Sequence, residues 1–372
     1  MSLHPQNQKA DQFSYQFPAI RGIQAGKEYY ATMCQLRLIP KIFLFDESEI
    51  PAQLRAQRTL NHARIPEIAN YILSNPDEYV FSSITASIDG KVQFIPIGEL
   101  GEDSKLGTLV IPMSARFIIN DGQHRRAAIE EALKSKPNIG LETISVVFFI
   151  DSGLKTSQQM FADLNKHAIQ PTKSLGILYD NRDPLSRLCL NIIEQIQIFR
   201  GFTDLEKTTI SNRSIKMFTL SSIYQATSEL LGKNSDFLNN FKQLEEKSVC
   251  YWNEVGNNIP EWQLIINRKI SSSELRKDYV HSHGIALHAL GRLGNSLIEY
   301  YPDDWANKLK KLNEIDWSRT NSSMWEGRAM LGARINKSHM NLILTTNVLK
   351  QFLDLPLSIE EQNIEDRFLN GR

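Results

Sequence analysis

The chain has 372 residues and a formal net charge of zero, with 41% apolar and 23% charged residues, as in ordinary globular proteins of two or three domains. Zero net charge excludes a strongly basic nucleic-acid coat protein but permits a local basic face. The cysteines Cys34, Cys189 and Cys250 have no paired spacing, which argues against a disulfide framework or a structural zinc site and favours a reducing compartment. No signal peptide is visible and the longest strongly apolar run, residues 144–150, is too short to cross a bilayer, so we expect a cytoplasmic protein with no membrane partner.

The first half of the chain alternates strand and helix signals. Residues 1–12 are polar and expected to be disordered, the alternation at 13–24 predicts a strand, and 38–45 is a second β-prone run. The apolar residues of 66–73 recur at helical spacing, which predicts a helix. Residues 80–97 are predicted to form a β-hairpin that turns at Asp89-Gly90. Apolar runs at 109–112 and 116–120 precede a predicted helix at about 124–134, and β-branching at 144–150 predicts a buried strand. Further helices are predicted over 157–166 and from Pro171.

The second half is predicted to be helical, because the runs after residue 185 repeat their apolar residues at helical spacing. The expected fold class is therefore α+β, with a mixed α/β domain at 13–184 and an α-helical domain at 185–355. Residues 356–372 are acidic and expected to form a solvated tail.

The sequence Asp121-Gly122-Gln123-His124-Arg125 joins an apolar strand to a helix through glycine. The first turn of a helix offers unpaired N–H groups and partial positive charge, so such a junction attracts phosphate. Basic residues oppose the helix dipole at this end, and their presence favours an anion site. The predicted phosphate-, nucleotide- or DNA-binding residues here are Gly122, Gln123, His124, Arg125 and Arg126. The alternative is an ordinary Asp-Gly turn followed by solvated first-turn residues.

A second helix start, at Pro171-Thr172-Lys173-Ser174, follows the end of a predicted helix at Asn165-Lys166. Asn165, Lys166, Thr172 and Lys173 are therefore added to the candidate phosphate-binding residues, although an ordinary capped corner between two helices explains the same pattern. Asp121 and Asp163 are weak catalytic candidates that could hold water or a metal, and the sequence predicts no dedicated metal site.

Other candidates are basic residues and one thiol. Arg64, Arg213, Lys216, Arg276 and Lys277 are candidate DNA contacts, although exposed Lys and Arg residues are common without any such role. Cys34, near Arg37 and Lys41, is a candidate redox or DNA-proximal thiol, with a small core residue as the favoured alternative.

Three segments of the first half resemble segments of a known protein family: residues 61–72, the DGQHRRAAI stretch and the later FADLNKHAIQPTKSLGILYD. Over about residues 13–185 the chain resembles the DGQHR-domain family, and most closely the DndB proteins of bacterial DNA phosphorothioate (DNA sulfur) modification systems. The resemblance implies a fold distantly similar to the ParB N-terminal and sulfiredoxin folds, in which a Gly-x-x-Arg-type turn binds nucleotide or DNA phosphates. Sulfiredoxins place a catalytic cysteine beside the His-Arg, where this chain has Gln123, so their sulfur chemistry is not implied. The CTP motif of ParB is not matched in spacing either.

The resemblance implies a DNA-binding transcriptional regulator, typically a repressor of the modification genes, and we expect this role rather than an enzyme. The expected partners are promoter DNA, the DNA-modification proteins and a second copy of the chain in a homodimer. One alternative is a nucleotide hydrolase or nuclease that uses the same turn, with a nucleotide as the only cofactor the pattern suggests. A second alternative is a non-catalytic scaffold of the modification system.

Overall fold

The computed structural model describes residues 13–43, 62–151, 156–166, 171–211, 213–232 and 236–371, and the predicted disordered start lies outside them. The chain divides into two compact units, residues 1–169 and 170–372. Among the described residues, no helix is both long and apolar enough to cross a membrane. The α+β fold class is confirmed, because a seven-stranded mixed sheet lies in the first unit and the second is built mainly from helices.

The sheet of the first unit has the strand order β4-β5-β1-β2-β7-β3-β6. Only β3 and β7 run parallel, and the other neighbours are antiparallel. The strands are β1 (Ser14–Gln24), β2 (Lys27–Gln35), β3 (Ile84–Asp89), β4 (Gln93–Pro96), β5 (Leu106–Pro112), β6 (Arg116–Asp121) and β7 (Thr143–Ile150). The predicted strands at 13–24 and 144–150 are therefore present, and β7, rich in Val, Ile and Phe, lies inside the sheet.

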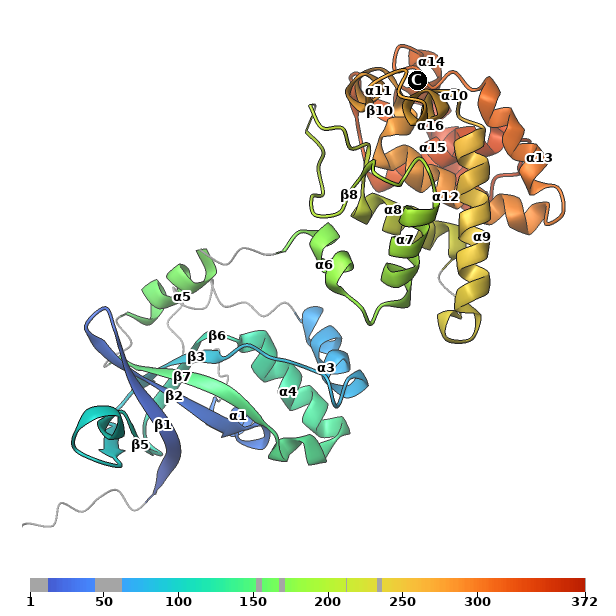
Figure 1. Cartoon of the computed structure of the whole chain (residues 1–372). Helices are drawn as coiled ribbons and strands as arrows, with labels where there is room; N and C mark the ends of the chain where they lie inside the picture. The colour runs from blue at the N-terminus through green and yellow to red at the C-terminus, as the bar shows by residue number, and fades with distance from the viewer. Residues whose placement is uncertain are drawn as a thin grey trace, which may run out of the picture. The chain divides into compact units, whose positions relative to one another are not determined.

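Three helices pack on one face of this sheet: α1 (Ile39–Ile42), α3 (Arg64–Ser74) and α4 (Gln123–Ser135). Their apolar residues join the core formed by the buried side chains Ile144, Val146 and Phe148 of β7. Figure 1 shows α3 and α4 side by side, which brings the start of α3 into the surroundings of the β6–α4 junction. Part of the opposite face is covered by α5 (Ser157–Lys166). The Ser157 hydroxyl donates to the side chain of Asn120 on β6, which is buried on this opposite face together with Ser87 of β3.

Two secondary-structure predictions in this unit are wrong. The β-prone run 38–45 begins a helix, α1, because Ile39 and Ile42 are three residues apart and both face the core, while Pro40 fits a first helical turn. Residues 80–97 do not form a hairpin: β3 lies between β7 and β6, and β4 pairs with β5 instead. Buried β3 side chains occur on both faces, Ile84, Ala86 and Ile88 on one and Ser87 on the other, which suits a strand inside the sheet.

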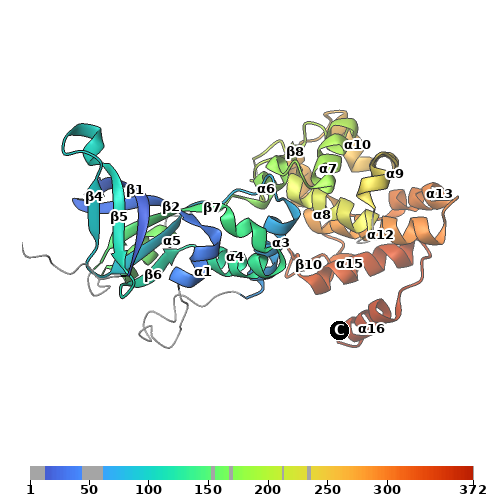
Figure 2. The ribbon, with the colours of Figure 1, turned by 90° about the horizontal axis from the view of Figure 1, so that it is seen from below.

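The second unit is a helical assembly, drawn from green to red in Figure 2. Its helices are α6 (Lys173–Tyr179), α7 (Pro184–Gln195), α8 (Leu220–Leu231), α9 (Phe237–Asn257), α10 (Pro260–Ile266), α11 (Ser272–Asp278), α12 (Gly284–Tyr300), α13 (Trp305–Leu309), α14 (Ser322–Trp325), α15 (His339–Phe352) and α16 (Ile359–Asn370). Two short strand pairs also occur, β8 (Thr203–Asp204) with β9 (Phe218–Thr219) and β10 (Met330–Leu331) with β11 (Arg334–Ile335). The core includes the fully buried Trp252, Trp262, Trp317 and Trp325.

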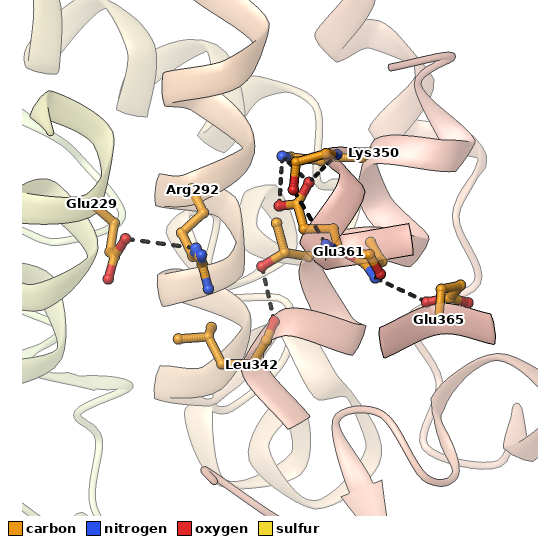
Figure 3. A network of polar contacts seen from close by, with 9 residues as sticks. Glu229, Arg292, Leu342, Lys350, Glu361 and Glu365 are labelled. Carbon is orange, nitrogen blue, oxygen red and sulfur yellow. Dashed lines mark hydrogen bonds and ion pairs between the residues drawn. The ribbon is translucent and has the colours of Figure 1, made fainter. Parts of the chain in front are cut away.

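The expected solvated tail is instead an anchored helix. Ser358 caps α16 with a capping box, and Glu365 is buried in an ion pair with Arg328. Glu361 accepts hydrogen bonds from the ammonium of Lys350 at 2.7 and 2.9 Å, in the network drawn in Figure 3. The acidic composition of this segment therefore partly reflects internal pairing with α15 and with Arg328.

Candidate functional site

The strand–glycine–helix junction predicted at residues 121–125 is present. β6 ends at Asp121, Gly122 has φ of 107°, and α4 begins at Gln123. Residues with a Cβ rarely adopt this backbone conformation, and a Cβ at Gly122 would also lie 3.0 Å from both Ile84 Cγ1 and Arg125 Nη2. The N-cap residue of α4 is Gly122, which carries no side chain to make a capping bond, and the positive end of the α4 dipole lies at the end of the strand.

His124 lies among positive charges. Burial lowers the pKa of its imidazole below the usual value, and the nearby charges of Arg64, Arg125 and His62 lower it further, against the opposing effect of Asp121. The imidazole is therefore neutral at pH 7, and protonation would add a charge to an already cationic cluster. A negatively charged ligand would remove that repulsion.

Arg125 is held over the glycine turn. Its Nη2 donates to Asp121 Oδ2 at 2.6 Å and to the carbonyl of Ser83 at 3.1 Å. Its Nε is buried and has no hydrogen-bond partner among the described residues. The ion pair with Asp121 is partly exposed, so it fixes the guanidinium at the junction while water weakens the pairing.

Arg126, a predicted phosphate-binding residue, makes internal contacts. Its buried guanidinium donates to the carbonyl of Phe43 at 2.9 Å, to that of Pro40 at 3.2 Å and to Glu130. It therefore ties α1 to α4. Gln123 also has an internal contact, since its amide donates to the carbonyl of Ile119 at 3.4 Å.

The first turn of α3 contributes to the cluster. Arg64, an exposed residue at the start of α3, was predicted as a DNA contact, and its charge acts on His124. His62, which precedes this helix, was missed as a site residue, although it lies in the segment that resembles the same family. The junction cluster is therefore His62, Arg64, His124 and Arg125, with Asp121 as its acidic member.

The two catalytic candidates have simpler roles in the described structure. Asp121 accepts from Arg125, and Asp163 accepts from Gln159 one turn earlier on α5 at 2.7 Å, an ordinary pair on an exposed helix face. Among the described residues there is no group of three or more His, Cys, Asp or Glu side chains that could hold a metal ion.

The second predicted phosphate site lies at the start of α6, which has its own N-cap. The Thr172 hydroxyl accepts from Leu175 N as the N-cap of α6 and donates to the carbonyl of Glu206. Lys173 is exposed, and α6 is short and packs with the helical unit. Asn165 and Lys166 end α5, but their side chains lie outside the described part of the chain.

Cys34 is a core residue, the alternative that the sequence favoured. It is fully buried on β2, and burial raises its pKa to about 12. The thiol is therefore protonated and shielded, as a core residue would be.

The basic candidates of the helical unit lie together. The Arg276 guanidinium donates to the carbonyls of Ser211 and Ser214 at 2.9 Å and to that of Lys216, which holds the loop containing the exposed Arg213. Lys216 Nζ donates to the carbonyl of Gly201 at 2.8 Å. Arg276 and Lys277 also line a cavity of about 400 Å³.

The fold and the junction cluster define an α+β protein with a cationic strand–glycine–helix turn. A family model described as "DndB: DNA-sulfur modification-associated" matches residues 17–356, so the chain belongs to the DndB family. Membership implies involvement in DNA sulfur modification. No curated protein and no solved structure matches the chain significantly.

Proposed function

We propose that this protein is a DNA-binding transcriptional regulator that represses the genes of a bacterial DNA phosphorothioate modification cluster. The observation that carries the proposal is the junction cluster at the start of α4. Family membership supplies the biological context, DNA sulfur modification. The DNA backbone is the polyanion that such a cluster would contact in that context.

Charge and geometry at the junction support phosphate as the ligand. Arg64 and Arg125 are permanently charged at physiological pH, and the uncapped first turn of α4 adds partial positive charge. Asp121 neutralises only part of this charge and holds Arg125 in place. The groups would grip a phosphate without reading a base, so sequence preference would come from other contacts.

The rest of the proposal follows the family resemblance. We propose that the first unit is ParB-like and sulfiredoxin-like in its use of the glycine turn, that the protein works in the cytoplasm, and that it binds its operator as a homodimer together with the DNA-modification proteins. The hydrolase and nuclease alternatives have weaker support, because the carboxylates of Asp121 and Asp163 already accept from neighbouring side chains.

The test is a fluorescence-anisotropy titration of the full chain with labelled duplexes from its own promoter, at several salt concentrations. We expect affinity to fall steeply with salt, and Arg64→Gln to weaken binding and lower the slope of log K against log salt by about one. Lys136→Gln is the matched control, because Lys136 is an exposed cation just beyond the other end of α4.

The proposal fails if wild type does not bind the promoter, or if Arg64→Gln and Lys136→Gln weaken binding equally. Phosphate release that His124→Ala abolishes in a folded protein would support the hydrolase alternative instead. Co-purification with the modification proteins in the absence of DNA binding would support the scaffold alternative.

A further inference from the structure

The cavity in the helical unit is strongly cationic. Arg276, Lys277, Arg319 and Lys337 line it, and none of its described lining residues is Asp or Glu. The remaining lining is mostly hydroxyl side chains, with an apolar wall that includes the buried Met217 and Phe218. A cavity of about 400 Å³ lies within the range of about 300–1,000 Å³ typical of small-molecule sites.

Two long helices begin at this cavity. Thr219, the N-cap of α8, and Gly284, the first residue of α12, both line it. The two helices pack in parallel: Gly284 approaches Ser222, Gly291 approaches Ala226, and Gly294 approaches Leu230. Their positive N-terminal ends therefore lie together, which is unfavourable for neighbouring helices unless negative charge is placed there.

No described side chain caps the start of α12. Its N-cap residue, His283, instead forms a hydrogen bond at 2.8 Å between its Nε2 and the carbonyl of Arg276. Residue 284 is glycine, so no side chain separates its backbone from Ser222 and Lys337. A Cβ at this position would lie 3.2 Å from the Lys337 ammonium nitrogen. Ala286 N–H donates to the carbonyl of His283, so among the described residues the N–H groups of Gly284 and Ile285 are left to a ligand or to water.

Two of the four basic residues hold the walls of the cavity in place, and the other two are available to bind a ligand. Arg276 and Arg319 donate to main-chain carbonyls and hold the surrounding loops. The ammonium groups of Lys277 and Lys337 make no hydrogen bond or ion pair with any residue that the structure describes. Lys337 exposes part of its side chain at the surface, yet partial desolvation of its ammonium lowers its pKa.

We propose that this cavity binds the phosphate group of a small molecule of mononucleotide size. Lys277 and Lys337 would pair with the phosphate oxygens, the start of α12 would supply N–H groups, and the N-terminal ends of both helices would supply partial positive charge. The apolar wall at Met217 and Phe218 would contact the uncharged part of the ligand. This site is independent of the junction cluster and does not rest on the proposed DNA binding.

The test is isothermal titration calorimetry of the full chain with inorganic phosphate, pyrophosphate, AMP and ATP at physiological ionic strength. We expect at least one nucleotide to bind with a Kd below about 1 mM and more tightly than inorganic phosphate. The double variant Lys277→Gln with Lys337→Gln should weaken binding at least tenfold, because two charge-assisted contacts are lost. Neither substitution removes a hydrogen bond or ion pair that the ammonium makes with a described residue, and circular dichroism verifies that the fold persists.

Two controls locate the site. Lys310→Gln removes an exposed lysine of the same unit that does not line the cavity, and it should leave Kd unchanged. Arg64→Gln changes the junction cluster and should also leave nucleotide binding unchanged, which separates this proposal from the proposed function. Absence of binding by every probe at 1 mM overturns the proposal, as does binding that Arg64→Gln abolishes and the double variant retains. Binding of a 5′-phosphorylated oligonucleotide but of no nucleotide would show that the phosphate belongs to DNA and would also overturn it.

Discussion

At the scale of single residues, His124 couples the junction cluster to pH. Burial and neighbouring positive charges lower the pKa of His124 in the free protein, so the imidazole is neutral at pH 7. A bound phosphate would favour the imidazolium and raise that pKa, and binding would then take up a proton. We expect DNA affinity to increase as pH falls from 8 to 6, by about tenfold per pH unit at most. Anisotropy titrations across this range measure the slope.

His124→Gln should flatten this pH dependence, and His62→Gln is the control for the other imidazole of the cluster. An unchanged slope in His124→Gln would show that some other group takes up the proton.

The thiols give a second prediction at the residue scale. Cys34 and Cys189 are buried, and burial raises the pKa of Cys34 to about 12, whereas Cys250 is exposed. We therefore expect Ellman's reagent to label one thiol per native chain quickly, and all three only after unfolding. Cys250→Ser should abolish the fast phase. Rapid native labelling that persists in Cys250→Ser but disappears in Cys34→Ser would support the interpretation of Cys34 as a redox thiol.

At the scale of elements, the β6–α4 junction depends on glycine for two separable reasons. Gly122 and Gly26 both have positive φ, but only at Gly122 would a Cβ also meet neighbouring atoms, at 3.0 Å. We expect Gly26→Ala to lower the free energy of unfolding by about 1–2 kcal/mol from backbone strain, and Gly122→Ala to lower it further. Chemical denaturation measures both changes. Equal losses would mean that the contacts with Ile84 and Arg125 relax without cost.

At the scale of the whole molecule, the helical unit depends on its C-terminal helix. Glu365, buried on α16, pairs with the buried Arg328, so Glu365→Gln would leave that guanidinium without a charged partner. We expect a loss of about 3–5 kcal/mol in the free energy of unfolding, measured by chemical denaturation. Glu360→Gln changes an exposed carboxylate of the same helix and should have little effect. If the two variants had similar free energies of unfolding, the buried ion pair of α16 would add no more to the stability of the unit than a solvated tail would.

The sequence by itself determined the local features of this protein. The alternation at 13–24, the β-branched run of β7 and the helical spacing of the second half are properties of neighbouring residues, so they predicted the main elements and the fold class. The glycine between strand and helix located the junction for the same reason, because its backbone conformation follows from one residue.

Only the tertiary structure decided which side chains are available to a ligand. Arg125 and Arg126 are neighbours in sequence, yet Arg126 turns into the core to bind α1, while Arg125 stays at the junction, where its charge and that of Arg64 act on His124. Likewise, Arg276 and Lys277 became part of a cavity only because two parallel helices begin there, and Glu365 became buried only because Arg328 lies opposite. Partners so distant in the chain are fixed by packing, and local sequence patterns carry no signal of that packing.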